Sequence, residues 1–539
     1  MLAVLLSWIF SFVIFMAMGC LLQKILWKQP AENYFFLLLN GMFLYMLIVW
    51  IILFFTGFGI GWQLFFMALS LFILWRLKCP VREKLLMHWN FLSHFEKTGL
   101  LVIAVVLLLV AAVPFYLPDN ESYYIQTVKW ANEEGFVYGL INLHQFLWQF
   151  SGWHILQAGV NLYNPYFTAN ALNAFFFLLF LFFVIFDKKN SYSPWLKFAG
   201  LFMPVMMFFV AVPSPDLAVW LLSLLVFDLF IKNYRETTPQ RLLQITILVL
   251  FTVLIKITAV LNLLLLLILW LKHLNVLKKI YKPVSIFGLI AGIFWLSKNY
   301  ILSGYLFYPF AFFSDFIHPD WRYPPDLLRY MLKLGKQANP VLEINHLKQS
   351  VVDWLFPAHF PENVFNPLFL ISLLVFPFIS KYKKNTSLDK KVYNIIYISI
   401  LLFFITFLFV GANMRFFLVF FMFFILVSVE WICKASCGKI VYHLSILWLF
   451  CCLFFPVVKS GLNLRSMVIP EVSALPDVIK EKTEADLKYY SLDNPAYFWE
   501  TGNAPLPAAN EQMIEFFKQN FHYVPYRHMK GFYMKKEND

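Results

Sequence analysis

The sequence is a succession of long apolar runs, each close to the twenty residues that an α-helix needs to cross the hydrocarbon core of a bilayer. Such runs must be helical, because a bilayer offers no water to satisfy free backbone N–H and C=O groups. They predict about 14 transmembrane helices, near residues 2–22, 34–56, 60–76, 98–117, 168–186, 196–213, 216–231, 242–256, 258–271, 284–302, 366–380, 392–411, 416–432 and 441–458. The segment 242–271 is short for two crossings, so one bent helix or a shallow hairpin is the alternative there.

The amino-acid composition agrees with a membrane protein. Of the 539 residues, 61% are hydrophobic and 14% are charged, whereas soluble globular domains contain about 45–50% apolar and about 25% charged residues. This composition excludes an ordinary soluble enzyme, a disordered chain and a nucleic-acid-binding domain. We therefore predict an all-α polytopic membrane protein.

The positions of Lys and Arg predict the orientation of the chain. The formal net charge is +13, which by itself would suggest nucleic acid as a partner. However, the basic clusters alternate with the apolar runs, near residues 24–28, 76–84, 188–189, 232–241, 278–282, 381–384 and 434–439. With 14 spans all of them fall on one side of the membrane, which is the cytoplasmic side by the positive-inside rule. The charge therefore indicates topology, and no nucleic acid is expected as a partner.

The opposite side carries the polar parts of the chain. These are a loop of roughly 118–165, a Pro-rich loop of roughly 303–365 and a C-terminal region of 460–539. We divide the chain into N-terminal transmembrane helices (1–97), a transmembrane core with the two outer loops (98–459) and this extracytoplasmic C-terminal region. An enzyme whose chemistry faces outward concentrates its polar residues in this way. Many transporters show paired halves instead, and we find no internal repeat.

The first outer loop begins with a carboxylate at the membrane surface. Pro118 ends an apolar run, and Asp119 or Asn120 is a good N-cap for a helix that lies along the interface. Asp119 is a candidate general base, because a base needs a fixed position and a partly desolvated carboxylate. A simple helix cap is the alternative. His144, later in the loop, is a candidate substrate contact, or else an interfacial histidine whose ring bonds the backbone.

Four more charged residues stand at or near the predicted outer ends of spans. Asp216 and Arg415 lie at turns, Lys298 near the end of its run, and Lys256 between two apolar stretches. Charged residues at such places are costly and usually functional, although helix caps and snorkelling side chains are the ordinary alternatives. Arg also suits phosphate, which it holds with two parallel hydrogen bonds. Together with Asp119, these residues favour a site for an anionic lipid-linked substrate.

Several short motifs follow one another in a familiar order. They are Pro118-Asp-x-x-x-Tyr-Tyr124, Pro213-Ser-Pro-Asp216, Lys256-Ile-Thr-Ala-Val260 and Trp295-Leu-Ser-Lys298-Asn-Tyr300. In this order they resemble bacterial GT-C-type integral membrane glycosyltransferases. More narrowly, the first motif with Gly139-Leu-Ile-Asn-Leu-His144 resembles the LIC_10190-type bacterial membrane proteins, which are often linked to cell-surface polysaccharide. The resemblance extends over about residues 98–539.

The resemblance implies a GT-C-like helical bundle in the bacterial inner membrane, with its active site facing the periplasm or exterior. A polyprenyl-phosphate-linked donor would give its hexosyl or pentosyl group to a glycan or lipid acceptor. A carboxylate, Asp119 first and Glu121 second, would deprotonate the acceptor hydroxyl. Lys256, Lys298 and Arg415 would stabilise the charge that develops on the leaving phosphate.

Other roles follow less directly from the resemblance. Asp216 would orient the acceptor or hold a metal. No cofactor is required by the residues, and a divalent cation such as Mg²⁺ or Mn²⁺ is left open. Trp321 and Arg322 in the second outer loop would contact the acceptor, the indole by stacking on a sugar, although anchoring in the membrane interface is the ordinary role of such a Trp.

Two other function classes compete with the glycosyltransferase. An O-antigen-type polymerase or ligase uses Arg residues of a large outer loop, and Arg322 and Arg329 lie in such a loop. A lipid-linked-sugar flippase performs no chemistry and would place its charges in the middle of spans. Most of the charges here stand at span ends, and Lys256 is the least certain of them.

Overall fold

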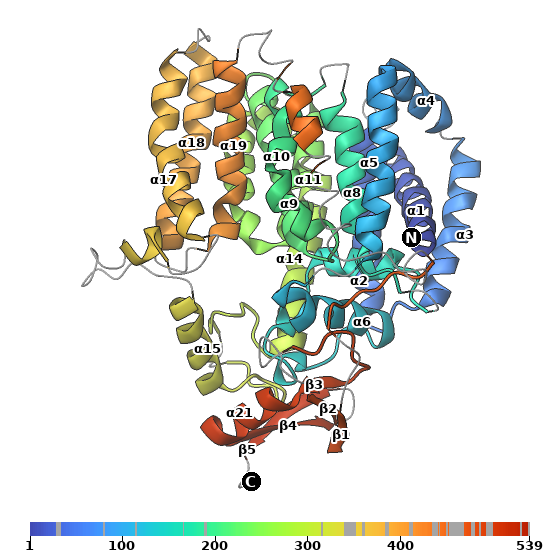
Figure 1. Cartoon of the computed structure of the whole chain (residues 1–539), viewed down its shortest axis with the longest axis vertical. Helices are drawn as coiled ribbons and strands as arrows, with labels where there is room; N and C mark the ends of the chain where they lie inside the picture. The colour runs from blue at the N-terminus through green and yellow to red at the C-terminus, as the bar shows by residue number, and fades with distance from the viewer. Residues whose placement is uncertain are drawn as a thin grey trace.

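The computed structural model describes residues 1–27, 34–78, 81–113, 116–164, 167–187, 191–313, 316–338, 352–357, 362–382, 387–408, 413–433, 440, 442–448, 451, 468–475, 480–484, 487–491, 500–528 and 531–536. This part of the chain is mostly helical, and most of the helices form one bundle (Figure 1). Eight of the described helices are long and apolar enough to cross a membrane. They are α1 (Leu2–Leu26), α2 (Tyr34–Leu53), α3 (Ile60–Leu77), α5 (His94–Ala112), α14 (Tyr281–Ser303), α17 (Glu362–Tyr382), α18 (Ser387–Leu408) and α19 (Met414–Ile432).

Further apolar helices complete the bundle, of which α10 has 19 residues and the others are shorter. They are α8 (Ala171–Phe180) with η4 (Leu181–Ile185), η5 (Pro194–Phe202) with α9 (Met203–Val210), α10 (Pro215–Asn233), α11 (Pro239–Ile255), and η6 (Ile257–Val260) with α12 (Leu261–Lys272). The predicted number of about 14 transmembrane helices is thus not established, because several of these helices are short for a bilayer. The last predicted span, 441–458, lies mostly outside the described residues. Helices α11 and α12 pack against each other, so segment 242–271 is a hairpin and not one bent helix.

Small residues allow the first two helices to approach closely. Helices α1 and α2 pack side by side. A Cβ atom at Gly41 would lie 1.7 Å from the carbonyl oxygen of Phe15, and one at Gly19 would lie 2.1 Å from that of Leu37. Glycine is therefore needed at both positions, as is common where membrane helices cross at short distance.

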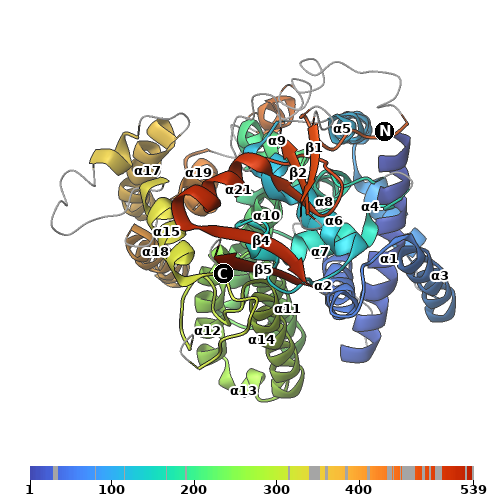
Figure 2. The same ribbon diagram turned by 90° about the horizontal axis from the view of Figure 1, so that it is seen from below.

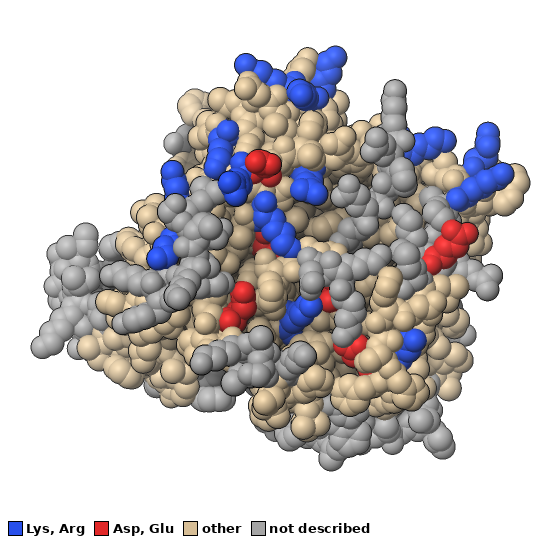
Figure 3. Space-filling model, turned by 90° about the horizontal axis from the view of Figure 1, so that it is seen from above, with Lys and Arg blue, Asp and Glu red and all other residues tan. Residues whose placement is uncertain are grey.

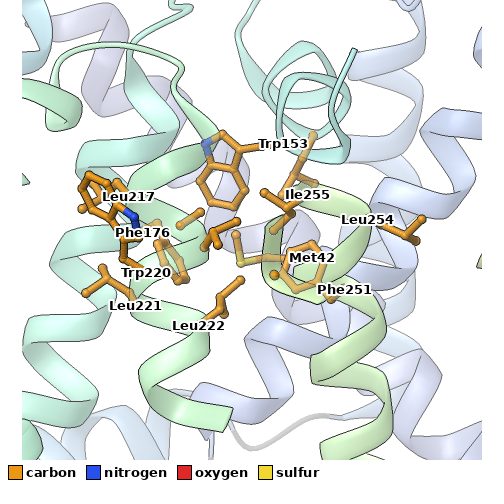
Figure 4. Close-up of a cluster of buried hydrophobic side chains, with 14 of the residues drawn as sticks. Met42, Trp153, Phe176, Leu217, Trp220, Leu221, Leu222, Phe251, Leu254 and Ile255 are labelled. Atoms are coloured by element: carbon orange, nitrogen blue, oxygen red, sulfur yellow. The ribbon is translucent and has the colours of Figure 1, made fainter. Parts of the chain in front are cut away.

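The outer loop 118–165 is held against the bundle by a buried apolar cluster. Helix α7 (Gly152–Val160) carries Trp153, which is fully buried. Figure 4 shows its ring among side chains of α2, α8, α10 and α11, including Met42, Phe176 and Leu217. The indole N–H of Trp153 donates to Asn173 of α8. Burial of an aromatic ring of this size, with its polar atom satisfied, fixes the loop firmly.

The remaining short helices lie in connections and at the two ends of the bundle. They are α4 (Val81–Phe91), η1 (Asn120–Tyr124), α6 (Ile125–Glu133), η2 (Leu140–Asn142), η3 (Leu147–Gln149), α13 (Leu274–Leu277), α15 (Pro325–Ala338) and α21 (Glu511–Phe521). A helix does follow Pro118, as η1 and α6, and nearly all of its side chains are buried against the rest of the protein. Both of these helices, α15 and α21 lie at one end of the molecule (Figure 1).

The same end carries five β-strands among the described residues, so the chain is not all-α as predicted. The strands are β1 (Lys480–Glu484), β2 (Leu487–Ser491), β3 (Ala508–Asn510), β4 (Tyr523–His528) and β5 (Gly531–Lys536). Strand β2 pairs antiparallel with β1 and parallel with β3, and β4 forms an antiparallel hairpin with β5. Figure 2 shows this hairpin and α21 lying across the end of the bundle. Open sheets of this kind are tolerated outside the hydrocarbon region, where water satisfies their edges.

The opposite end of the bundle is basic. Figure 3 shows Lys and Arg side chains gathered over this face, with few carboxylates among them. The last turns of α1, α3, α10 and α12 carry Lys24, Arg76, Lys232 and Lys272. The two ends of the bundle therefore differ in charge and in the structures that they carry.

Candidate functional site

Four of the predicted site residues meet in one ion cluster, formed by Asp119, Asp216, Lys256 and Arg415. A guanidinium nitrogen of Arg415, Nη1, lies 2.5 Å from Asp119 Oδ2 and 3.7 Å from Asp216 Oδ2. The ammonium of Lys256 pairs with the other oxygen of Asp216. Two positive and two negative groups thus alternate at the strand-bearing end of the bundle.

Helix ends position these four side chains. Asp216 is in the first turn of α10, where Pro215 begins the helix and the hydroxyl of Ser214 accepts from the Asp216 N–H at 3.2 Å. Arg415 is in the first turn of α19, whose cap Asn413 accepts from the Arg415 N–H at 2.9 Å. Lys256 has an extended backbone conformation that separates α11 from η6. Its side chain therefore also lies at a helix end.

Asp119 does not serve as a simple helix cap. It precedes η1, but its side chain makes no capping hydrogen bond and points to Arg415. The side chain of Asp119 is 26% exposed and that of Asp216 is 2% exposed. The cluster therefore has an accessible carboxylate at its rim and a buried one below, with Arg415 between them.

Tyr124 and Ser214 extend the cluster, and the sequence analysis assigned no role to either. The phenol of Tyr124 donates to Asp119 Oδ2 at 3.4 Å, and the hydroxyl of Ser214 donates to the Tyr124 oxygen at 3.4 Å. Burial and the nearby carboxylates hold the pKa of Tyr124 well above its usual value. Its phenol therefore stays protonated and acts as a donor. Tyr124 belongs to the same short motif as Asp119, and Ser214 to the same motif as Asp216. This shared motif is the sequence signal that could have predicted both as site residues.

A cleft opens beside the cluster, between α10, α12 and α19. Asp216 and Arg415 form its polar end, and Trp220 bonds the Arg415 carbonyl oxygen through its indole N–H at 3.1 Å. The lining side chains nearly fill this cleft and leave a cavity of only about 10 Å³. The other lining residues are mostly apolar: Val219, Ser223, Thr258, Ala259, Leu261, Asn262, Phe416, Val419 and Phe420. An ionic end and an apolar wall suit an amphipathic molecule.

Lys298 makes no ion pair with the cluster among the described contacts. Its ammonium donates to the Phe150 carbonyl oxygen at 3.1 Å. The His154 ring stands 5.1 Å from that of Tyr124. Burial, with the charges of Lys298 and Lys256, lowers the pKa of His154 to about 3. This imidazole is therefore neutral.

Glu121 faces the C-terminal region and not the cluster. Its carboxylate accepts from Asn120, from the Ser473 hydroxyl and from the Ala474 N–H. Its backbone carbonyl accepts from the N–H groups of Thr501 and Gly502 at 3.0 and 2.8 Å. The structure thus places the second candidate base in a different environment from the first.

The remaining predicted contacts have other neighbours. His144 is buried and accepts from the Phe146 N–H through Nδ1 at 3.2 Å. Trp321 donates to the Tyr300 carbonyl oxygen at 3.2 Å, and Arg322 contacts His318 at 2.5 Å. None of these described contacts involves the ion cluster. Among the described residues, no group of three or more His, Cys, Asp or Glu side chains is arranged to hold a metal.

The chain matches a family described as Domain of unknown function (DUF8201) over residues 1–422. It belongs to this family. No curated protein and no solved structure matches the chain. The DUF8201 match includes all four residues of the ion cluster and Tyr124, whereas the five strands lie beyond it.

Proposed function

We propose that this protein is a GT-C-type membrane glycosyltransferase, which moves a sugar from a polyprenyl-phosphate-linked donor to a glycan or lipid acceptor. The observation that carries the proposal is the ion cluster of Asp119, Asp216, Lys256 and Arg415 beside a cleft with apolar walls. Such a donor combines a long apolar chain with a phosphate. A site for it needs cations at helix ends and an apolar surface between helices.

The reaction would use the accessible carboxylate as general base. Asp119 takes the proton of the acceptor hydroxyl while the acceptor oxygen bonds to the anomeric carbon of the sugar. The bond between that carbon and the phosphate oxygen breaks, and its electron pair leaves with the polyprenyl phosphate. Arg415 and Lys256 stabilise this growing negative charge, because positioned cations act most strongly where charge develops.

The present pairing of Arg415 supports an exchange of partners. Its guanidinium contacts two carboxylate groups, and a phosphate offers the same charge and a similar pair of oxygens. A bound donor phosphate would therefore draw Arg415 away from Asp119. Asp119 would lose its counter-charge at the moment when the acceptor hydroxyl needs a base.

The proposal includes an arrangement in the membrane. The shorter apolar helices would also cross, giving about 14 spans with the basic face of Figure 3 in the bacterial cytoplasm. Asp119 and the strands would then face the periplasm or exterior. This fits a donor whose lipid tail stays in the bilayer, because the phosphate would rest at the depth of the helix ends.

Mass spectrometry of lipid-linked and surface glycans tests the proposal. A deletion strain should accumulate an acceptor that lacks one sugar, and the wild-type gene should restore it. Purified protein in nanodiscs with polyprenyl-phosphate sugars should release polyprenyl phosphate when acceptor is added. An unchanged glycan profile in the deletion strain would contradict the proposal. A complete lipid-linked glycan trapped on the cytoplasmic side would also contradict it and would indicate a flippase.

A further inference from the structure

Four phenylalanines of the second outer loop are exposed, shortly after the end of α14. The exposed fractions of Phe310, Phe312, Phe313 and Phe316 are 54%, 61%, 58% and 84%. The rings of Phe310 and Phe312 stack, with their centroids 5.6 Å apart. We call these four residues the phenylalanine patch. Exposed apolar surface of this kind marks a place where a protein meets another protein or a membrane.

Two buried tyrosines fix the start of this loop to the rest of the protein. The hydroxyl of Tyr305 donates to the Tyr323 carbonyl oxygen at 2.9 Å. The ring of Tyr308 lies 4.8 Å from that of Trp148 in η3. Both tyrosines are at most 5% exposed. The patch is therefore carried by a packed loop, and its exposure is a property of the folded chain.

Phe307 shows where the loop lies along α14. Its ring contacts that of Trp295, with the centroids 5.9 Å apart. Trp295 precedes the last residue of α14, Ser303, by eight positions, which is about 12 Å along the helix axis. Side chains of a helix also tilt toward its N-terminus, so the Trp295 ring is no closer to that end. The loop therefore turns back beside α14 and does not simply leave the bundle.

The side of α14 that Phe307 covers is open. Trp295 follows Gly288 by seven residues, which is about two helical turns, so the two lie on the same side of α14. Nothing lies within 4 Å of a Cβ added to Gly288, and Leu289 and Ile293 nearby are 65% and 50% exposed. Because α14 is long and apolar enough to cross a membrane, this open side is expected to contact lipid acyl chains.

Phe307 also joins the open side of α14 to the phenylalanine patch. Its ring centroid lies 6.2 Å from that of Phe312 and 5.9 Å from that of Phe313. Apolar surface therefore continues from α14 onto the patch. Residues 304–313 contain no charged side chain, so no charge in this stretch has to be kept in water. The Phe310 N–H donates to the Phe307 carbonyl oxygen at 2.8 Å, which satisfies a backbone group that lipid could not serve.

We propose that the phenylalanine patch inserts into the lipid leaflet at the strand-bearing end of the bundle, where the acyl chains meet the head groups. Aromatic side chains are common at this depth. Insertion would anchor the second outer loop in the bilayer and, through the contact of Tyr308 with Trp148, would also hold η3 of the first outer loop at the membrane surface.

The alternative occupant of the patch is a second copy of the chain. The bilayer is favoured because the patch continues the open side of a helix that can cross a membrane. This proposal does not depend on the glycosyltransferase reaction, since it concerns only the position of the loop relative to lipid.

Photocrosslinking identifies what the patch contacts. The photoreactive amino acid p-benzoylphenylalanine takes the place of Phe316 in the full-length protein, which is reconstituted in phosphatidylcholine vesicles and irradiated. Mass spectrometry should find an adduct that is heavier by one lipid molecule. The same probe at Leu289, on the open side of α14, is the positive control. The probe at Glu515, an exposed carboxylate of α21, is the negative control and should give no lipid adduct.

Fluorescence quenching measures the depth of the loop. A fluorescent amino acid in place of Phe316 should lose roughly half of its emission or more in vesicles of lipid brominated on the acyl chains, because a ring at this boundary contacts those chains. The double change Phe310→Ser with Phe312→Ser should reduce this quenching. Leu332→Ser, at an exposed position of α15 outside the patch, is the matched control and should leave it unchanged.

Two results would overturn the proposal. Crosslinks from position 316 to a second copy of the chain, without a lipid adduct, would show that the patch is a contact between copies. A probe at position 316 that is not quenched, while the same probe at Leu289 is quenched, would show that the loop stays in water. Each probe replaces one exposed side chain of an otherwise unchanged protein, so both results are obtained even where the serine variants fail to fold.

Discussion

The guanidinium of Arg415 lies 2.5 Å from the carboxylate of Asp119, although the two residues are 296 positions apart in the chain. The guanidinium nitrogen that makes this contact, Nη1, is also 3.7 Å from Asp216 Oδ2. One side chain of α19 thus connects the first outer loop to the start of α10. Any ligand that competes for Arg415 would therefore change the charge pairing of both carboxylates together.

Asp119→Asn should abolish glycosyl transfer and leave the protein folded in the membrane. The amide cannot act as a base, and loss of a general base lowers turnover by about 10²- to 10⁴-fold. The fold should tolerate the change, because Asp119 caps no helix and its side chain is 26% exposed. Release of polyprenyl phosphate in nanodiscs measures transfer, and detergent gel filtration measures folding. Asp320→Asn, in the second outer loop, is the control; full activity of Asp119→Asn would remove the base assignment.

Lys256→Met should destabilise the protein more than the double change Lys256→Met with Asp216→Asn. The single change leaves Asp216, which is 2% exposed, with only the more distant Arg415 as a counter-charge, and breaking a buried ion pair costs up to about 3 kcal/mol. The double change removes both charges, so much of that loss should be recovered. Unfolding midpoints in detergent measure the difference. Lys282→Met, at an exposed position of α14, should be neutral. Additive effects of Lys256→Met and Asp216→Asn would argue against a direct pair.

The sequence predicts the ion cluster well, because a charged residue at the end of an apolar run is expected to lie at the membrane surface. Asp119, Asp216, Lys256 and Arg415 all stand at such ends, so a common depth was expected before any contact was known. Lys298 shows the limit of this reasoning. It lies more than one turn inside α14, and its direction around the helix axis is set by packing that the run of apolar residues does not specify.

The C-terminal region was harder to predict for a different reason. Its strands pair with one another, β1 with β2 and β4 with β5, but the region is attached to the rest of the chain through distant residues, as where Gly531 bridges to Tyr138. Short polar strands carry little periodic pattern of their own. The surroundings of Glu121 could not be predicted for the same reason, since its partners Ser473 and Ala474 lie about 350 residues away.

Gly139→Ala should loosen the attachment of the β4–β5 hairpin. Gly139 has φ +63°, and an added Cβ would lie 2.2 Å from the Phe532 carbonyl oxygen. The left-handed conformation alone costs a non-glycine residue about 1–2 kcal/mol, and the contact adds to it. Limited proteolysis should cut the C-terminal region faster in this variant. Gly288→Ala is the control, because nothing lies within 4 Å of a Cβ there. Equal cleavage rates in the two variants would contradict the predicted contact.

The neutral, buried His154 should make the protein less stable as the pH falls from about 6.5 toward 3. Burial, with the charges of Lys298 and Lys256, lowers its pKa to about 3, whereas an unfolded histidine titrates near 6.5. Between these values the unfolded chain binds more protons, so the free energy of unfolding rises with pH and is lost on acidification. His154→Asn keeps an acceptor for the Ser151 N–H but does not titrate. Its unfolding midpoint should therefore depend less steeply on pH over this range than that of the wild type. The control is His528→Asn, at an exposed position of β4, which should leave the pH dependence of the unfolding midpoint unchanged. The same pH dependence for His154→Asn and the wild type would contradict the prediction.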